Sequence, residues 1–271
     1  MRRQCHEQVI ELMSNYGKID ILWYDGLWLA HDMKTDAETA PAFWQGRQLN
    51  EQVRRLQPQI VINNRLGDPA DFDTPEGRIV PPADPRRPWE CCKTMTQGWG
   101  YYGGTPDVFA RSAAEVIKDL IDCVSQGGNF LVNIGVTPDG TLPGEAVRTL
   151  HEVGEWMDVN GESIYGASSI DFQKDRYAWT RKGDVYYYHM YSYPLDGRKV
   201  FPLMDAKVKN ISILGSDYVP CVEYASNGRL VIANLPSAPP VPPFLTLRIE
   251  FESTPRKREE KDPGAWLSGR A

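Results

Sequence analysis

The sequence predicts two fold classes in one chain: an α/β region built on a parallel sheet, followed by an all-β region. Before Tyr165, amphipathic helices alternate with short apolar runs, which is typical of parallel strands covered by helices. After Tyr165 the apolar runs are closely spaced, and turn residues rather than helices separate them. With 41% hydrophobic residues over 271 positions, the chain can build a core in each region.

The α/β region is predicted to contain four helices and four strands. Helices are expected where apolar residues recur at helical spacing, and strands where short apolar runs end at turn residues. The helices are expected at about 3–15, 47–56, 106–125 and 144–160, and the strands at about 19–25, 60–62, 88–95 and 129–136. Residues 66–88, rich in Pro, Asp and Gly, are predicted to form a long loop, and such a loop in a compact domain is usually functional.

The all-β region is predicted to be an antiparallel β-sandwich. Its strands are expected at about 177–181, 185–191, 208–214, 219–224, 230–234 and 245–251. A boundary near residue 166 then gives an α/β domain over 1–165 and a sandwich domain over 166–253. Residues 254–271 carry mixed charges and are predicted to form a flexible tail.

Composition narrows the classes of partner and compartment. The formal net charge is −6, with 36 acidic and 30 basic residues, which argues against nucleic acid or an anionic membrane as partner. No stretch approaches the ~20 apolar residues of a membrane span, and the first helix lacks the continuous apolar run of a signal peptide. The five cysteines form no spaced ligand pair, so we expect reduced thiols, a cytoplasmic location, no metal and no cofactor.

The segment IDILWYDG, residues 19–26, ends a predicted buried strand on one carboxylate. In a β/α barrel the carboxyl end of each strand faces the catalytic mouth. Alternation along the strand places Trp23 and Asp25 on the same face, so an aromatic wall would stand beside the carboxylate. The alternative is that Asp25 only begins a loop or caps the next helix, and this segment alone does not decide between the two.

Six segments, the first of which contains IDILWYDG, carry a resemblance to a known family. In chain order they are YGKIDILWYDG, INNRLG, DFDTPE, PWECCKTMTQGWGY, GGNFLVNIGVTPDGTLP and LHEVGEWMDVNGESIYG, and they cover most of residues 8–166. With them the chain resembles the retaining α-L-fucosidases of glycoside hydrolase family 29. The resemblance implies a (β/α) TIM-like barrel followed by a β-sandwich, and a fucosylated glycoside as substrate.

The resemblance also implies roles for individual residues. Asp25 matches the catalytic nucleophile, Glu76 of DFDTPE the general acid/base, and Arg65 of NNRLG an arginine that lines the sugar site. The chemistry of these residue types agrees, since a retaining glycosidase needs two carboxyls ~5–5.5 Å apart, one as nucleophile and one as proton donor. Trp23 is expected to pack against the sugar. Glu90 of PWECC is the alternative acid/base, because the adjacent Trp89 and cysteines could desolvate it.

Asp25 comes unusually early for this family. The family's nucleophile ends roughly the fourth barrel strand, so the resemblance implies that the N-terminal half of the barrel, with its sugar-binding histidines, is absent. A half barrel exposes strand edges and an apolar interior, and we therefore expect a homo-oligomer in which another subunit covers the open edge. Three functions remain open: a minimal α-L-fucosidase, a catalytically weak sugar-binding or structural remnant, and a fragment that needs complementation by another chain.

Overall fold

The computed structural model describes residues 1–27, 33–96, 98–101, 103, 110–170 and 178–256. The chain divides into two compact units, the first spanning Met1–Lys93 and the second beginning at Thr94. The division into compact units falls between residues 93 and 94, whereas the predicted boundary near 166 marks the change from α/β to all-β structure. The domain boundary near 166 stays a prediction. Most of the predicted tail lies outside the described residues.

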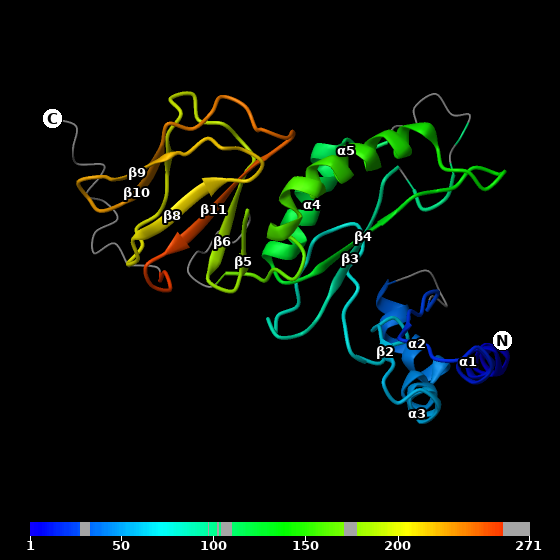
Figure 1. The fold of residues 1–271 in the computed structure, drawn as a ribbon. Helices are drawn as coiled ribbons and strands as arrows, with labels where there is room; N and C mark the ends of the chain where they lie inside the picture. Colours follow the sequence, from blue (N-terminus) through cyan, green and yellow to red (C-terminus); the bar gives the residue numbers. More distant parts are fainter. Residues whose placement is uncertain (28–32, 97, 102, 104–109, 171–177, 257–271) are drawn as a thin grey trace. The chain divides into compact units, whose positions relative to one another are not determined.

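The first unit contains three helices packed on two short parallel strands (Figure 1). The helices are α1 (Arg2–Asn15), α2 (Met33–Trp44) and α3 (Gly46–Leu56), and the strands are β1 (Ile21–Leu22) and β2 (Val61–Ile62). Helix α3 is amphipathic, and its buried face includes Leu49 and Val53. These side chains join a core that also includes Met13, Tyr24, Ala40, Trp44, Ile60, Ile62 and Leu66. The sequence reasoning did not predict α2.

Parallel pairing continues beyond β1 and β2 through the predicted loop. Leu22 pairs with Ile62, and isolated parallel bridges then join Asn63 to Phe72, Asp73 to Trp89 and Glu76 to Cys92. Residues 71–77 are therefore extended and hydrogen-bonded rather than a free loop, which corrects part of the expectation for 66–88. The next strand, β3 (Glu90–Thr94), confirms the strand predicted at 88–95, and the boundary between the two units falls within it.

The second unit opens with two helices and one strand between them. These are α4 (Ala113–Ser125), β4 (Asn129–Asn133) and α5 (Gly144–Asn160), followed by the short 3₁₀ helix η1 (Gly161–Ser163). Helix α4 begins later than predicted, because the Ser112 side chain caps it together with Glu115 in a capping box. The predicted span of α5 is confirmed.

Two antiparallel sheets complete the second unit. The four-stranded sheet has the order β5 (Trp179–Lys182), β6 (Val185–Met190), β11 (Leu245–Phe251), β8 (Val208–Ile213), and the three-stranded sheet has the order β7 (Lys199–Val200), β10 (Leu230–Ala233), β9 (Cys221–Tyr224). All six predicted strands are confirmed, and β7 is additional. Their buried side chains form one core, and α5 packs against this region, since the Trp156 indole donates to the Phe244 carbonyl at 3.1 Å. The α/β plus all-β class is thus observed.

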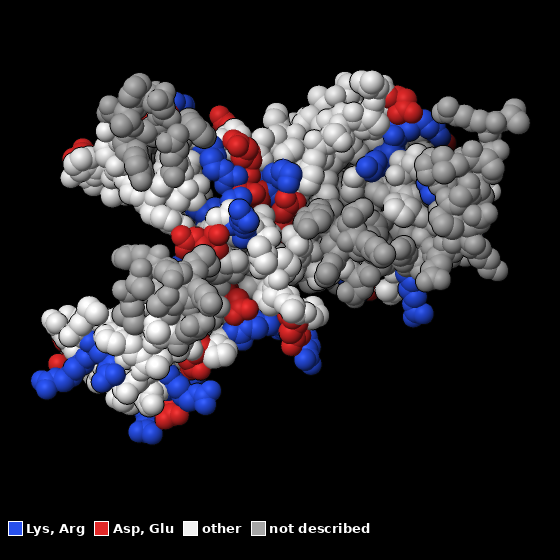
Figure 2. Space-filling view, turned by 180° about the vertical axis from the view of Figure 1, so that it is seen from behind, with Lys and Arg blue, Asp and Glu red and all other residues white. Residues whose placement is uncertain are grey.

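Charged side chains of both signs are interspersed on the face shown in Figure 2. Within the described part of the chain, no helix has the length and apolar character needed to cross a bilayer.

Candidate active site

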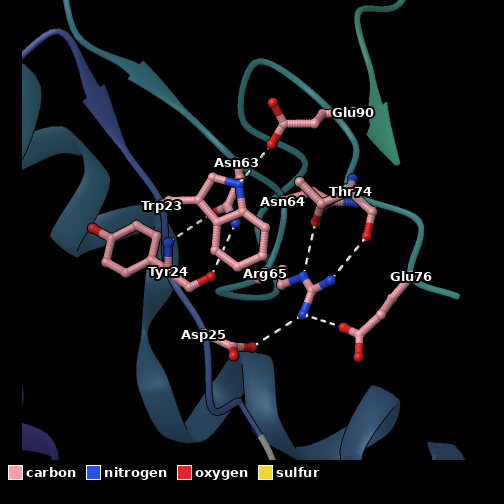
Figure 3. A network of polar contacts seen from close by, with 9 residues as sticks. All are labelled: Trp23, Tyr24, Asp25, Asn63, Asn64, Arg65, Thr74, Glu76 and Glu90. Carbon is pink, nitrogen blue, oxygen red and sulfur yellow. Dashed lines mark hydrogen bonds and ion pairs between the residues drawn. The ribbon is translucent and has the colours of Figure 1, made fainter. Parts of the chain in front are cut away.

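Asp25 directly follows Tyr24, whose backbone is held by a side-chain clamp two residues beyond the end of β1 (Figure 3). The side chain of Asn63 accepts a hydrogen bond from the Tyr24 N–H and donates one to the Tyr24 carbonyl, each at 2.9 Å. Gly26 then turns the chain with φ +82°, a conformation that glycine adopts without strain. Asp25 is therefore held at a fixed point of the backbone, between the clamp and this turn.

Trp23 and Asp25 lie on the same side of this segment. Both contact Arg65: its guanidinium carbon lies 4.5 Å from the Trp23 ring centroid, and its Nη1 lies 3.1 Å from Asp25 Oδ1. Tyr24, between them, is buried in the core of the first unit. The alternation predicted for this strand therefore places the aromatic ring and the carboxylate together.

Arg65 joins the two carboxylates that the sequence singled out. Its Nη1 contacts both Asp25 Oδ1 at 3.1 Å and Glu76 Oε2 at 2.7 Å. The arginine side chain is 15% exposed, whereas those of Asp25 and Glu76 are 54% and 40% exposed. Because both oxygens contact one nitrogen, these two oxygens lie at most about 6 Å apart, and this upper limit is compatible with the ~5–5.5 Å between the carboxyls of retaining glycosidases.

Thr74 and Asn64 orient the guanidinium, and the sequence reasoning missed both. Arg65 Nε donates to Thr74 Oγ1 at 2.9 Å, and Nη2 donates to the Thr74 carbonyl at 3.2 Å. The Thr74 hydroxyl in turn donates to Asn64 Oδ1 at 3.0 Å. These contacts fix the plane of the guanidinium and leave Nη1 for the carboxylates. The only signal in the sequence was the pair of asparagines that precedes the arginine in NNRLG.

Glu76 lies in an extended, hydrogen-bonded segment rather than in a free loop. The Gly77 N–H donates to the Cys92 carbonyl at 2.9 Å, and the Cys92 N–H donates to the Pro75 carbonyl at 3.0 Å. The backbone of Glu76 is therefore held on both sides, while its carboxylate remains accessible.

Glu90 lies in the same network, but it contacts Trp23 rather than Arg65. Its Oε1 accepts a hydrogen bond from the Trp23 indole N–H at 3.3 Å. Behind it, burial raises the pKa of Cys92 to about 11, although the positive charge of Arg65 opposes this rise. The thiol is therefore protonated at neutral pH and acts as an uncharged packing group.

The arrangement suits chemistry that needs two carboxylates on either side of a bond. Asp25 and Glu76 are accessible, close together and held by fixed backbone, with a cation between them. Within the described residues, no group of three or more His, Cys, Asp or Glu side chains is placed to hold a metal ion. The structure thus brings Trp23, Asp25, Arg65, Glu76 and Glu90 into one site.

Comparisons with known proteins all find similarity to α-L-fucosidases. A profile described as Alpha-L-fucosidase matches residues 2–162. Tissue alpha-L-fucosidase of Homo sapiens is 27% identical over 203 residues, covering 70% of this chain and 41% of that protein. Plasma alpha-L-fucosidase of Homo sapiens is 31% identical over 191 residues, covering 66% of this chain and 38% of that protein.

The solved structures agree in fold. Alpha-L-fucosidase isoenzyme 1 from Paenibacillus thiaminolyticus matches with a TM-score of 0.78 and 29% identity, covering 93% of this chain and 62% of that chain. A GH29 alpha-L-fucosidase from Bacteroides thetaiotaomicron matches with a TM-score of 0.77 and 23% identity, covering 92% and 60%. Such structures combine a TIM barrel with a β-sandwich. The chain spans about half the length of the curated relatives it matches, at 41% to 50% for the first two.

Proposed function

This chain belongs to the α-L-fucosidase family, and from that premise we propose that it hydrolyses terminal α-L-fucosides with retention of configuration. The observation that carries the proposal is the contact of one Arg65 nitrogen with both Asp25 and Glu76. Two carboxylates that share one cation nitrogen can reach the ~5–5.5 Å separation of a double displacement, whereas an inverting enzyme keeps them ~6.5–9.5 Å apart to admit a water molecule.

In the first step Glu76 protonates the glycosidic oxygen while an Asp25 oxygen attacks the anomeric carbon. The bond to the aglycone breaks, the alcohol leaves, and a fucosyl ester forms on Asp25. In the second step Glu76 removes a proton from water, and the water oxygen attacks the same carbon and releases Asp25. Arg65 holds the carboxylates in position, and Trp23 offers an apolar surface to the sugar.

Turnover of an aryl α-L-fucoside tests this function. We expect release of nitrophenol by the unmodified chain, loss of at least about 10³-fold in kcat for Asp25→Asn, and fucose that first appears as the α anomer in NMR spectra. Asp20→Asn is the matched control, because Asp20 directly precedes β1, is exposed and forms an ion pair with Lys18. Equal activity of Asp25→Asn and the control would remove Asp25 from the mechanism.

The alternative functions predict different results from the same assay. No turnover together with retained fucose binding would favour a sugar-binding or structural remnant. Turnover that appears only after a second polypeptide is added would favour a fragment that needs complementation. Both alternatives are kept because the chain covers only 41% of the length of the human tissue enzyme.

We further propose that the α/β region forms half of a barrel and that a second copy of the chain covers the open strand edge of the first unit. Among the described residues of that unit, β1 has β2 as its only neighbouring strand, so its other edge is unpaired. Ile21 and Val61 are partners in the ladder, yet they are 60% and 41% exposed. Exposed apolar residues beside a free edge favour association. Light scattering at micromolar concentration should give a multiple of the 30.7 kDa chain mass, and a stable monomer would contradict this.

A further inference from the structure

We infer that Asn63 is the positioning residue of the nucleophile: its side-chain amide replaces the missing strand pairing at Tyr24 and thereby fixes Asp25. This inference rests on the proposed function for its catalytic consequence. The clamp itself is a structural feature that can be tested without any turnover.

The backbone ladder stops just where the site begins. The last ladder pair is Leu22 with Ile62, and the Asn63 N–H still donates to the Leu22 carbonyl at 3.3 Å. From there the two segments diverge, because the backbone of Asn63 bridges to Phe72 on its other side. The N–H and carbonyl of Tyr24 therefore face a place where no backbone partner follows.

The amide of Asn63 fills that place. Its Oδ1 accepts from the Tyr24 N–H and its Nδ2 donates to the Tyr24 carbonyl, each at 2.9 Å, and the residue is 0% exposed. An amide carries one acceptor and two donors in one plane, so it reproduces the hydrogen-bonding pattern of a neighbouring peptide group. A carboxylate of the same shape offers no donor at neutral pH, and an apolar side chain satisfies neither Tyr24 group.

The clamp links both halves of the charged pair. Tyr24 directly precedes Asp25, and Asn63 is two residues before Arg65 on the adjacent segment. One side chain thus ties the backbone that carries the carboxylate to the backbone that carries the guanidinium, and the 3.1 Å contact between them depends on this tie. Displacement of a reacting group by about 1 Å can cost 10²-fold in rate, so we expect the clamp to act on kcat.

The test compares Asn63→Asp with the control Leu49→Ala. Leu49 lies in the core of the same unit and takes no part in the hydrogen bonds between Asn63 and Tyr24, so its truncation destabilises the unit without removing the clamp. We expect kcat for an aryl α-L-fucoside to fall about 10²-fold in Asn63→Asp while KM changes little, and kcat to stay unchanged in Leu49→Ala below its unfolding temperature. Equal kcat in the two variants would overturn the positioning role.

A second measurement uses the unmodified chain and needs neither turnover nor a variant that folds. Hydrogen exchange at the Tyr24 amide should be slowed at least as much as at an amide of the β1–β2 ladder, and exchange at the rate of an open amide would overturn the clamp. Slow exchange at Tyr24 in a chain without fucosidase activity would reject the proposed function and leave the clamp standing. Fast exchange at Tyr24 in an active chain would reject the clamp and leave the proposed function standing.

Discussion

The indole N–H of Trp23 donates a hydrogen bond to Oε1 of Glu90 across 3.3 Å. The centroid of the same indole ring lies 4.5 Å from the guanidinium carbon of Arg65, and this arginine contacts Asp25 and Glu76. Glu90 therefore acts on the site through Trp23, while Glu76 contacts the shared arginine directly. This difference separates the two candidates for the acid/base by a measurable property.

Azide should restore activity to Glu76→Ala and should fail to do so in Glu90→Ala. A small anion can attack the glycosyl intermediate when the general base is removed, but it cannot re-orient an indole ring. The measurement is turnover of an aryl α-L-fucoside with and without azide, with detection of fucosyl azide. Glu90→Gln is the matched control, because its amide oxygen still accepts from Trp23, and we expect it to keep activity within about tenfold. Rescue of Glu90→Ala alone would exchange the two roles.

Arg65→Lys should lower kcat/KM by at least about tenfold although the positive charge is kept. A lysine cannot make the contacts of Nε and Nη2 with Thr74 while also reaching both carboxylates, and a hydrogen bond to a charged group contributes about 1.5–3 kcal/mol. Arg55→Lys, on the exposed side of α3, is the control and should leave kinetics unchanged. Equal kinetics for the two variants would show that Arg65 acts only as a point charge.

Thiol reactivity should follow burial. Cys221 is exposed, while Cys91, Cys92 and Cys123 are buried, and the raised pKa of Cys92 leaves little thiolate at pH 8. We expect a disulfide reagent at pH 8 to modify Cys221 rapidly and the three buried thiols only in denaturant, as read by peptide mass mapping. Rapid modification of Cys92 in the native chain would mean that its strand opens readily.

Acid should destabilise the second unit through His189. This residue is 0% exposed, and burial lowers its pKa to about 3. Its Nε2 and Nδ1 bond to the hydroxyls of Thr180 and Thr246, so the neutral ring is satisfied. The unfolded state binds a proton below about pH 6.5 and the folded state does not until about pH 3, so the stability is full above pH 6.5 and is lost as the pH falls.

Between pH 7 and pH 5 the free energy of unfolding should fall by about 2 kcal/mol more in the native chain than in His189→Gln. Glutamine keeps a donor and an acceptor near Thr180 and Thr246 but does not titrate. Urea unfolding at the two pH values, followed by tryptophan fluorescence, measures the difference. The same pH dependence in both proteins would assign the acid sensitivity to other groups.

Local pattern was enough to predict most helices and strands. Helix α5 follows from its apolar spacing, and the six sandwich strands follow from alternation between turn residues. Helix α2 escaped prediction because Pro41 lies inside it and the segment has no clear apolar stripe. Helix α4 starts at its capping box, although apolar residues continue further upstream. Tertiary bridges, which no local pattern encodes, make residues 71–77 extended.

The charged residues of the site were predictable, and the groups that hold them were not. The motifs that contain Asp25, Glu76 and Arg65 predict the roles of these residues, because carboxylates and an arginine are the residue types that a glycosidase site needs. Asn63 and Thr74 act through hydrogen bonds to backbone and to a neighbouring side chain, and such contacts leave no characteristic spacing in the sequence. Partial-barrel architecture and homo-oligomerisation stay predictions.

The single guanidinium shared by Asp25 and Glu76 also bears on which sugars are admitted. Asp25 and Glu76 contact this one arginine, and Glu90 accepts a hydrogen bond from Trp23 in the same network of Figure 3, so three carboxylates accompany one cation there. A uronic acid or a sialic acid would bring a further negative charge into this cluster and would be repelled. A deoxy sugar without an acidic group meets no such barrier. If the proposed function holds, this excess of negative charge would disfavour anionic glycosides whatever their pattern of hydroxyls.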